Sequence, residues 1–200
     1  MLPRRTVLVT LAAVTATSSF AQGQSSGAQG SVGASGPEQQ WMQQTQKIGS
    51  LSLAISRIAE QKAEFDDLKE FAKFEVAEQE AVADVLKSLQ NPGQVSGTIR
   101  PPSEAEVEQH LDQHGREELQ KMRAAQAGSQ FDRDYLEAQT NGHQQLLRIQ
   151  EEYLNSGRNL DAINVAKLAR GLIKEHLQLL ADINSDMESG GTTGAAPGQR

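Results

Sequence analysis

Hydrophobic residues recur with alternating gaps of three and four along four stretches between residues 37 and 187. This spacing places side chains on one face of an α-helix, whereas a strand would show alternation at every second residue. The expected buried faces are Trp41, Ile48, Leu51, Ile55 and Ile58; Leu68, Ala72, Glu75, Gln79, Val82, Leu86 and Leu89; Phe131, Tyr135, Ala138, Gly142, Leu146, Ile149 and Tyr153; and Val165, Ala169, Leu172, His176, Leu179 and Ile183. The pattern therefore predicts an all-α domain over residues 37–187 with four main helices.

Residues that start or stop helices separate these stretches. Pro37 suits the first turn of a helix, and a break within residues 62–65 separates the first helix from the second. The second helix should end at Asn91-Pro92-Gly93, because proline cannot continue the helical hydrogen bonds. The third should end at Ser156-Gly157, and the fourth should cover about residues 159–185. These signals predict an up-down bundle of four helices.

The segment between the second and third helices also carries helical signals. Ser103 and Glu106 form a capping-box pattern, and a thin apolar stripe continues to about residue 128, with Gly115 as its weak point. Glu106, His110 and His114 are spaced by four and would share one helical face, which makes a surface metal clip conceivable. We favour a solvated polar face, because the glutamate that follows the first histidine of a zinc-protease helix is missing. The segment is expected to be a helical crossover that covers the bundle.

The first 21 residues have the pattern of a secretory signal peptide. Arg4 and Arg5 precede a short apolar run over residues 7–16, and small residues end at Ala21, where we expect cleavage. The apolar run is shorter than the roughly 20 residues of a membrane-spanning helix, and no later stretch approaches that length. The sequence thus predicts a periplasmic or secreted protein without a membrane span.

Both ends of the expected mature chain are rich in small and polar residues. Residues 22–36 should form a flexible leader and residues 188–200 a disordered tail, because neither has enough apolar surface to offset the entropy of ordering. The chain has no cysteine, which excludes a disulfide scaffold and a thiolate metal site. The stability of the domain must therefore come from helix packing.

The charge balance is acidic. The chain has 19 Lys and Arg against 26 Asp and Glu, so its net charge of −7 would become −9 once Arg4 and Arg5 leave with the signal peptide. An acidic surface repels phosphate backbones, which argues against nucleic acid as a partner. The remaining candidate partners are an unknown protein or a second copy of the chain.

Polar residues interrupt the buried faces near the middle of the helices. Ser52 and Glu75 lie eleven or twelve residues from the break that joins their helices, and His143 and His176 lie fourteen to eighteen from the turn at residues 157–158. With a rise of about 1.5 Å per residue, all four positions fall at mid-bundle. Ser52 is expected to be a small residue where helices approach closely.

Two interpretations of this polar centre are open. In one, Glu75 or Glu78 joins His143 and His176 to bind a divalent metal such as Fe, Mn or Zn between the helices. In the other, no cofactor is bound, and His176 donates a hydrogen bond to Glu75 or Gln79 within a structural polar layer. The sequence favours the structural layer, because a di-iron bundle uses more carboxylates and a Glu-x-x-His motif on two helices. No motif indicates catalysis.

Three motifs carry a resemblance to a known family. They are Leu68-Lys69-Glu70-Phe71-Ala72-Lys73, Phe131-Asp132-Arg133-Asp134-Tyr135-Leu136 with His143 downstream, and Glu175-His176-Leu177. Over about residues 38–185 the chain resembles the exported bacterial family known as domain of unknown function 4142. The resemblance implies a ferritin-like four-helix bundle and a signal peptide, with His143 and His176 matching the family's usual histidines and no established activity.

Two positions depart from that family's pattern, and both departures remove potential metal ligands. Ser52 stands where members often have a glutamate, and Glu78-Gln79 stands where many have an Asp-His pair. We therefore expect an exported, non-catalytic helical bundle that acts in the cell envelope or in a stress response. The alternative is a metal-binding or redox ferritin-like protein that uses Glu75, Glu78, His143 and His176.

Overall fold

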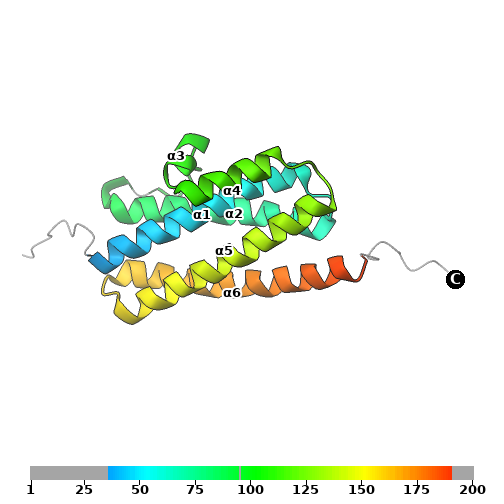
Figure 1. Ribbon diagram of the computed structural model, residues 1–200. Helices are drawn as coiled ribbons and strands as arrows, with labels where there is room; N and C mark the ends of the chain where they lie inside the picture. Colours follow the sequence, from blue (N-terminus) through cyan, green and yellow to red (C-terminus); the bar gives the residue numbers. More distant parts are fainter. Residues whose placement is uncertain (1–35, 95, 191–200) are drawn as a thin grey trace, which may run out of the picture. The chain divides into compact units, whose positions relative to one another are not determined.

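The computed structural model describes residues 36–94 and 96–190, and these residues form an all-helical unit without strands (Figure 1). The helices are α1 (Gly36–Lys62), α2 (Asp66–Gln90), α3 (Glu104–Gln109), α4 (Gln113–Ala124), α5 (Ser129–Ser156) and α6 (Leu160–Glu188), with a short 3-10 turn, η1 (Pro92–Gln94). The all-α prediction is confirmed for this part of the chain. The predicted signal peptide, the leader up to residue 35 and the tail from residue 191 lie outside the described residues.

The four long helices, α1, α2, α5 and α6, contact one another around a common core. Helix α1 packs against both α2 and α5, α5 packs against α6, and α2 touches α6 over only a few residues. Helices α3 and α4 form the connection between α2 and α5 and lie against α1 (Figure 1). Helix α1 is therefore covered on several sides, and it buries residues on more than one face.

The core consists of two apolar clusters that lie at different heights along the long helices. One contains Ile55, Ala59, Leu68, Phe71, Ala72, Tyr135, Leu136, Leu180 and Ile183, and the other contains Trp41, Met42, Leu86, Tyr153, Ala162 and Ala166. Ser52, Glu75, His143 and His176 each lie between the two clusters along their own helix. The fold thus places a polar layer between two apolar ones.

The turn between α1 and α2 is held by a carboxylate from α5. The break predicted within residues 62–65 is confirmed, since α1 ends at Lys62 and α2 begins at Asp66. Buried Asp132 accepts hydrogen bonds from the backbone N–H groups of Glu64 (3.2 Å) and Phe65 (2.9 Å). A carboxylate suits this place because N–H groups at the start of a helix have no acceptor within the helix.

The crossover differs from the expectation in where it breaks. The helix is interrupted at residues 110–112 rather than at Gly115, because Asp112 caps α4 by accepting a hydrogen bond from the Gly115 N–H (2.8 Å). Glu106 therefore belongs to α3 and His114 to α4, and the three residues Glu106, His110 and His114 do not share one helical face. The prediction of a common face was wrong, and the carboxylate of Glu106 instead bonds to Ser103.

The buried face of α6 is rotated from the predicted one. Leu172 and Leu179, both predicted to be buried, are 39% and 49% exposed, whereas Ile173 and Leu180 are 7% and 1% exposed. Adjacent residues on a helix point about 100° apart, and the buried face of α6 is turned by roughly half that angle, so His176 and Ile183 belong to both the predicted and the observed face. The cause is its packing, which is extensive against α5 and slight against α2. His176, at 6% exposure, is buried as predicted.

Candidate functional site

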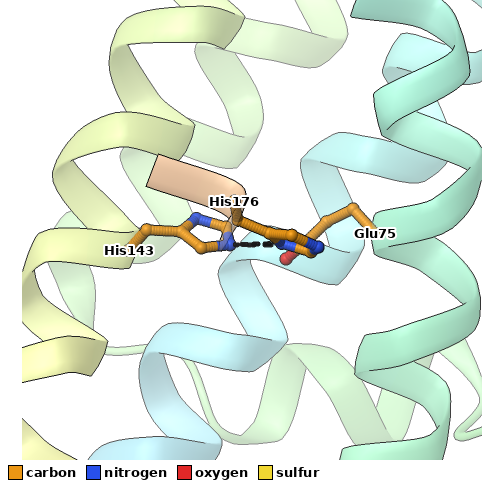
Figure 2. A group of neighbouring side chains, drawn as sticks. All are labelled: Glu75, His143 and His176. Atoms are coloured by element: carbon orange, nitrogen blue, oxygen red, sulfur yellow. Dashed lines mark hydrogen bonds and ion pairs between the residues drawn. The ribbon is translucent and has the colours of Figure 1, made fainter. Parts of the chain in front are cut away.

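Three side chains from three helices meet in the polar layer. Glu75 comes from α2, His143 from α5 and His176 from α6, and they are 0%, 1% and 6% exposed (Figure 2). Glu75 Oε2 lies 3.4 Å from His143 Nε2 and 3.0 Å from His176 Nδ1, and the two nitrogens are 3.0 Å apart. Among the described residues, this is the group whose His and carboxylate donor atoms could converge on one metal ion.

In each imidazole, the nitrogen that faces away from Glu75, called the outer nitrogen, has a hydrogen-bond acceptor of its own. His143 Nδ1 lies 2.8 Å from the backbone carbonyl oxygen of Gln139, and His176 Nε2 lies 3.1 Å from Glu78 Oε2. A carbonyl oxygen can only accept, and an ionised carboxylate likewise only accepts, so both outer nitrogens carry a proton. In neutral imidazoles the inner nitrogens, His143 Nε2 and His176 Nδ1, then carry lone pairs that point at Glu75.

Glu75 Oε2, His143 Nε2 and His176 Nδ1 form a triangle of atoms, and these protonation states place neither a proton nor a positive charge inside it. If both imidazoles are neutral, three acceptor atoms face one another with no proton between them. Glu75 Oε2 is buried and receives no hydrogen bond of acceptable geometry from the described residues. A buried polar atom without a partner costs about 1–3 kcal/mol, so the arrangement requires either an extra proton or a cation.

The spacing of the three atoms fits a small metal ion. Bonds of about 2.0–2.1 Å to nitrogen and oxygen in a tetrahedral site put neighbouring ligand atoms about 3.3 Å apart. The three distances between donor atoms here are 3.0, 3.0 and 3.4 Å. Hydrogen bonds from the outer nitrogens to a carbonyl and a carboxylate are also what orients metal-binding histidines. The residues present therefore fit a divalent transition-metal ion.

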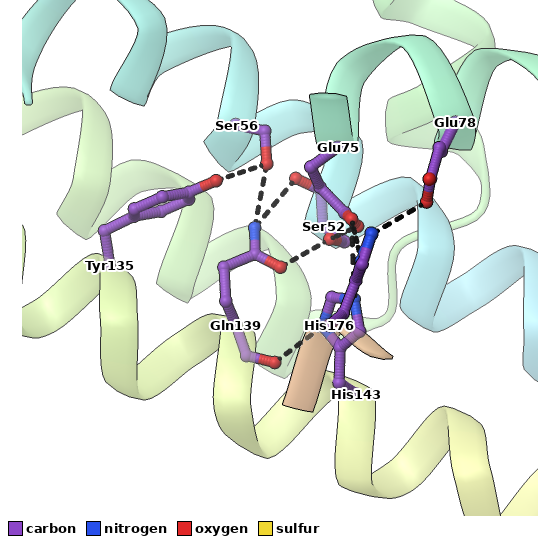
Figure 3. Close-up of polar contacts among 8 residues, drawn as sticks. All are labelled: Ser52, Ser56, Glu75, Glu78, Tyr135, Gln139, His143 and His176. Atoms are coloured by element: carbon purple, nitrogen blue, oxygen red, sulfur yellow. Dashed lines mark hydrogen bonds and ion pairs between the residues drawn. The ribbon is translucent and has the colours of Figure 1, made fainter. Parts of the chain in front are cut away.

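A series of hydrogen bonds orients the Glu75 carboxylate through its other oxygen, Oε1, which does not face the two histidines (Figure 3). The Ser52 hydroxyl can donate to Glu75 Oε1 (2.5 Å) or to Gln139 Oε1 (2.7 Å). Gln139 Nε2 donates to Ser56 Oγ (2.8 Å), which in turn bonds to the Tyr135 hydroxyl (2.7 Å). Ser52 is therefore a hydrogen-bonding partner of the layer, beyond the small spacer that its size suggested.

The charged groups of the polar layer shift the pKa values of Glu75 and His176. Burial alone would raise the pKa of Glu75, but the imidazoles of His143 and His176 and the Ser52 hydroxyl outweigh it and hold that pKa well below its usual value. Burial would lower the pKa of His176, but Glu75 and Glu78 outweigh it and raise the pKa to about 9. Without a metal ion, His176 is therefore protonated at neutral pH and lies between two carboxyl groups.

Of the four predicted site residues, three form the triangle and the fourth lies behind it. Glu75, His143 and His176 converge, whereas Glu78 contacts the far side of His176 and is partly exposed (Figure 3). The sequence did not point to Gln139. Its one signal is its position four residues before His143, which puts both on the same helical face.

The described residues thus define an all-helical protein with a buried Glu-His-His cluster between its long helices. A family model described as Domain of unknown function (DUF4142) matches residues 23–183, and the chain belongs to this family. No curated protein and no solved structure matches the chain. Within the described part of the chain, no helix combines the length and the apolarity needed to cross a bilayer.

Proposed function

We propose that this protein is an exported helical bundle that binds one divalent transition-metal ion through Glu75, His143 and His176. The observation that carries the proposal is the proton count: three buried donor atoms converge while both outer imidazole nitrogens already donate elsewhere. A single proton forms good hydrogen bonds to two of these atoms at most, whereas one cation can bind all three. The sequence alone favours a structural layer, and this geometry favours the ion.

The donor set narrows the choice of ion. Two imidazoles with one carboxylate occur in zinc enzymes and in mononuclear iron(II) sites, and in both cases further positions stay open. The absence of cysteine removes the thiolates that copper(I) and iron–sulfur clusters prefer. Iron, manganese and zinc are therefore the candidates. Glu78 would act from behind His176, by fixing the tautomer that turns Nδ1 toward the ion.

The proposed setting is an up-down, ferritin-like four-helix bundle outside the cytoplasm. The contacts of α1 with α2 and α5, and of α6 with α5 and α2, support a closed ring of four helices. The signal-like pattern of residues 1–21 supports export to the periplasm or beyond. A protein partner or a second copy of the chain remains part of the proposal.

The second candidate is a non-catalytic bundle of the envelope or a stress response, in which the layer is structural. It is favoured by the pKa of His176, which is raised to about 9, so that this side chain is protonated at neutral pH. Its Nδ1–H could then be shared between Glu75 Oε2 and His143 Nε2, both 3.0 Å away. In this case the protein would act through its surface.

Metal analysis of protein purified without an affinity tag separates the two candidates. After exposure to iron(II), manganese or zinc and removal of unbound ion, the wild type should retain about one ion per chain. His143→Ala should retain none, because it removes one of three ligands. The matched control is His114→Ala, the same change at an exposed histidine of α4, which should bind as the wild type does. A wild type without any of the three ions, or His143→Ala with a full complement, would refute metal binding.

A further inference from the structure

A small cavity adjoins the two histidines on one side of the layer. It has room of about 30 Å³, and His143, His176 and Glu78 line it, whereas Glu75 does not. Its other walls include Gln79, Leu146 and Ile173, which lie one helical turn from Glu75, His143 and His176 respectively. All three walls are on the side of the layer that faces the cluster around Trp41 and Leu86. A volume of this size holds one or two water molecules.

The opposite side of the layer is closed by an aromatic ring. Phe71 packs edge-on against both imidazoles, with ring centroids 6.1 Å from His143 and 5.2 Å from His176. Phe71 is 4% exposed and belongs to the other apolar cluster. The phenyl ring therefore blocks a ligand from reaching an ion in the triangle from this side, whereas the cavity offers an approach from the other side.

We propose that the fourth position around the ion opens into this cavity and takes a small anion of two or three atoms, or a single water molecule. This proposal rests on the proposed metal site. A divalent ion bound by one carboxylate and two neutral imidazoles keeps one net positive charge, which attracts an anionic fourth ligand. The carboxylate of Glu78, which also lines the cavity, opposes this attraction in part, and its contact with His176 Nε2 (3.1 Å) holds it on the far side of that ring from the ion. Three protein ligands with an open position are also typical of zinc sites that bind exogenous molecules.

The cavity sets the size limit of that ligand. Apolar walls at Leu146, Ala169 and Ile173 leave no room for a ring or a branched chain. On the polar side, Gln150 is fixed because its Oε1 accepts from Trp41 Nε1 (2.7 Å) and its Nε2 donates to Thr45 Oγ1 (3.2 Å). A rigid wall excludes large ligands more sharply than a mobile one, so the site should discriminate by size.

Cobalt(II) provides the test, since its visible absorption reports both the occupancy and the coordination of the site. Azide added to the cobalt-loaded wild type should change the spectrum saturably, whereas benzoate at the same concentration should not. No cobalt spectrum at all would refute the metal site itself. A normal cobalt spectrum that azide leaves unchanged, or that benzoate changes equally, would refute the open position within the cavity.

A substitution that fills the cavity tests the proposal further, and the same substitution elsewhere on α6 is its matched control. Ala169→Leu places a larger side chain in the cavity wall, and Ala181→Leu makes the same change at an exposed position of α6. Both variants should bind cobalt within about twofold of the wild type. Azide affinity should fall at least tenfold in Ala169→Leu and stay unchanged in Ala181→Leu. Equal azide affinity in the two variants would contradict the proposal, and the comparison of azide with benzoate on the wild type decides the matter if Ala169→Leu does not fold.

Discussion

Replacing His176 by leucine tests the electrostatics of the layer without any metal. In chelator, His176→Leu removes the imidazolium from Glu75, whose side chain is 0% exposed and whose Oε2 then keeps only His143, at 3.4 Å. Breaking a buried ion pair by removing one partner costs about 3–5 kcal/mol. For a domain of this size, that loss corresponds to a fall in Tm of about 6–20 °C.

The second change should reverse most of this loss. In the double variant His176→Leu with Glu75→Leu, no buried carboxylate remains, and apolar pairs that replace buried ion pairs are often neutral or stabilising. One cost persists, because His143 Nε2 loses both of its neighbours, and an unpaired buried acceptor costs about 1–3 kcal/mol. The double variant should therefore unfold within about 1–3 kcal/mol of the wild type.

Urea unfolding in chelator, followed by circular dichroism, measures these free energies. The control is His114→Leu at an exposed position, which should change the stability by less than about 0.5 kcal/mol. The reasoning would be refuted if His176→Leu were as stable as this control. The single variant Glu75→Leu completes the set. The reasoning would also be refuted if the double variant lost as much stability as His176→Leu and Glu75→Leu lose when their separate losses are added, since residues that interact must show coupling.

Four further outcomes are expected. Burial lowers the pKa of His176, but Glu75 and Glu78 outweigh it and raise this pKa from 6.5 to about 9. Without metal, the stability that the His176 imidazolium contributes should therefore be complete below pH 6.5 and lost as the pH rises through 9. Urea unfolding midpoints measured across this pH range test this. Asp132→Ala should cost about 1–3 kcal/mol of unfolding free energy, because two backbone N–H groups lose their acceptor. Ser52→Ala should cost a similar amount, as a donor to a buried carboxylate is lost. Sequencing of the protein from the envelope fraction should begin at Gln22, and an intact Met1 would contradict the export proposal.

The existence of the long helices could be predicted because their signals are local. Apolar spacing marks each helix, and breaks such as residues 62–65 follow from nearby residues alone. The face of α6 that is buried was not predictable in the same way. Both Leu172 and Ile173 are apolar, as are Leu179 and Leu180, so the pattern fits two rotations of the helix, and only packing against α5 selects one.

The site could be predicted in part for a related reason. A histidine or a glutamate on an apolar face is conspicuous, so Glu75 and His176 stood out, and distances from the turns placed them at the same height. Gln139 and Ser56 are common polar residues, and nothing local distinguishes a buried one from an exposed one. Which nitrogen of each histidine faces Glu75 depends on side-chain geometry, and the protonation argument could not be made from spacing alone.

The charged side chains of the polar layer also hold α6 against α2. Helices α2 and α6 touch each other over few residues, yet Glu75 and Glu78 of α2 both contact His176 of α6. These polar contacts, together with the packing of Phe71 of α2 against the His176 ring, therefore attach α6 to α2 at the layer. Because the donor atoms converge only when α2, α5 and α6 are packed, the free energy of binding an ion there would add to the free energy of folding. Loss of the ion or of the His176 proton would then weaken the same contact, since either change leaves the buried Glu75 carboxylate without a positive partner.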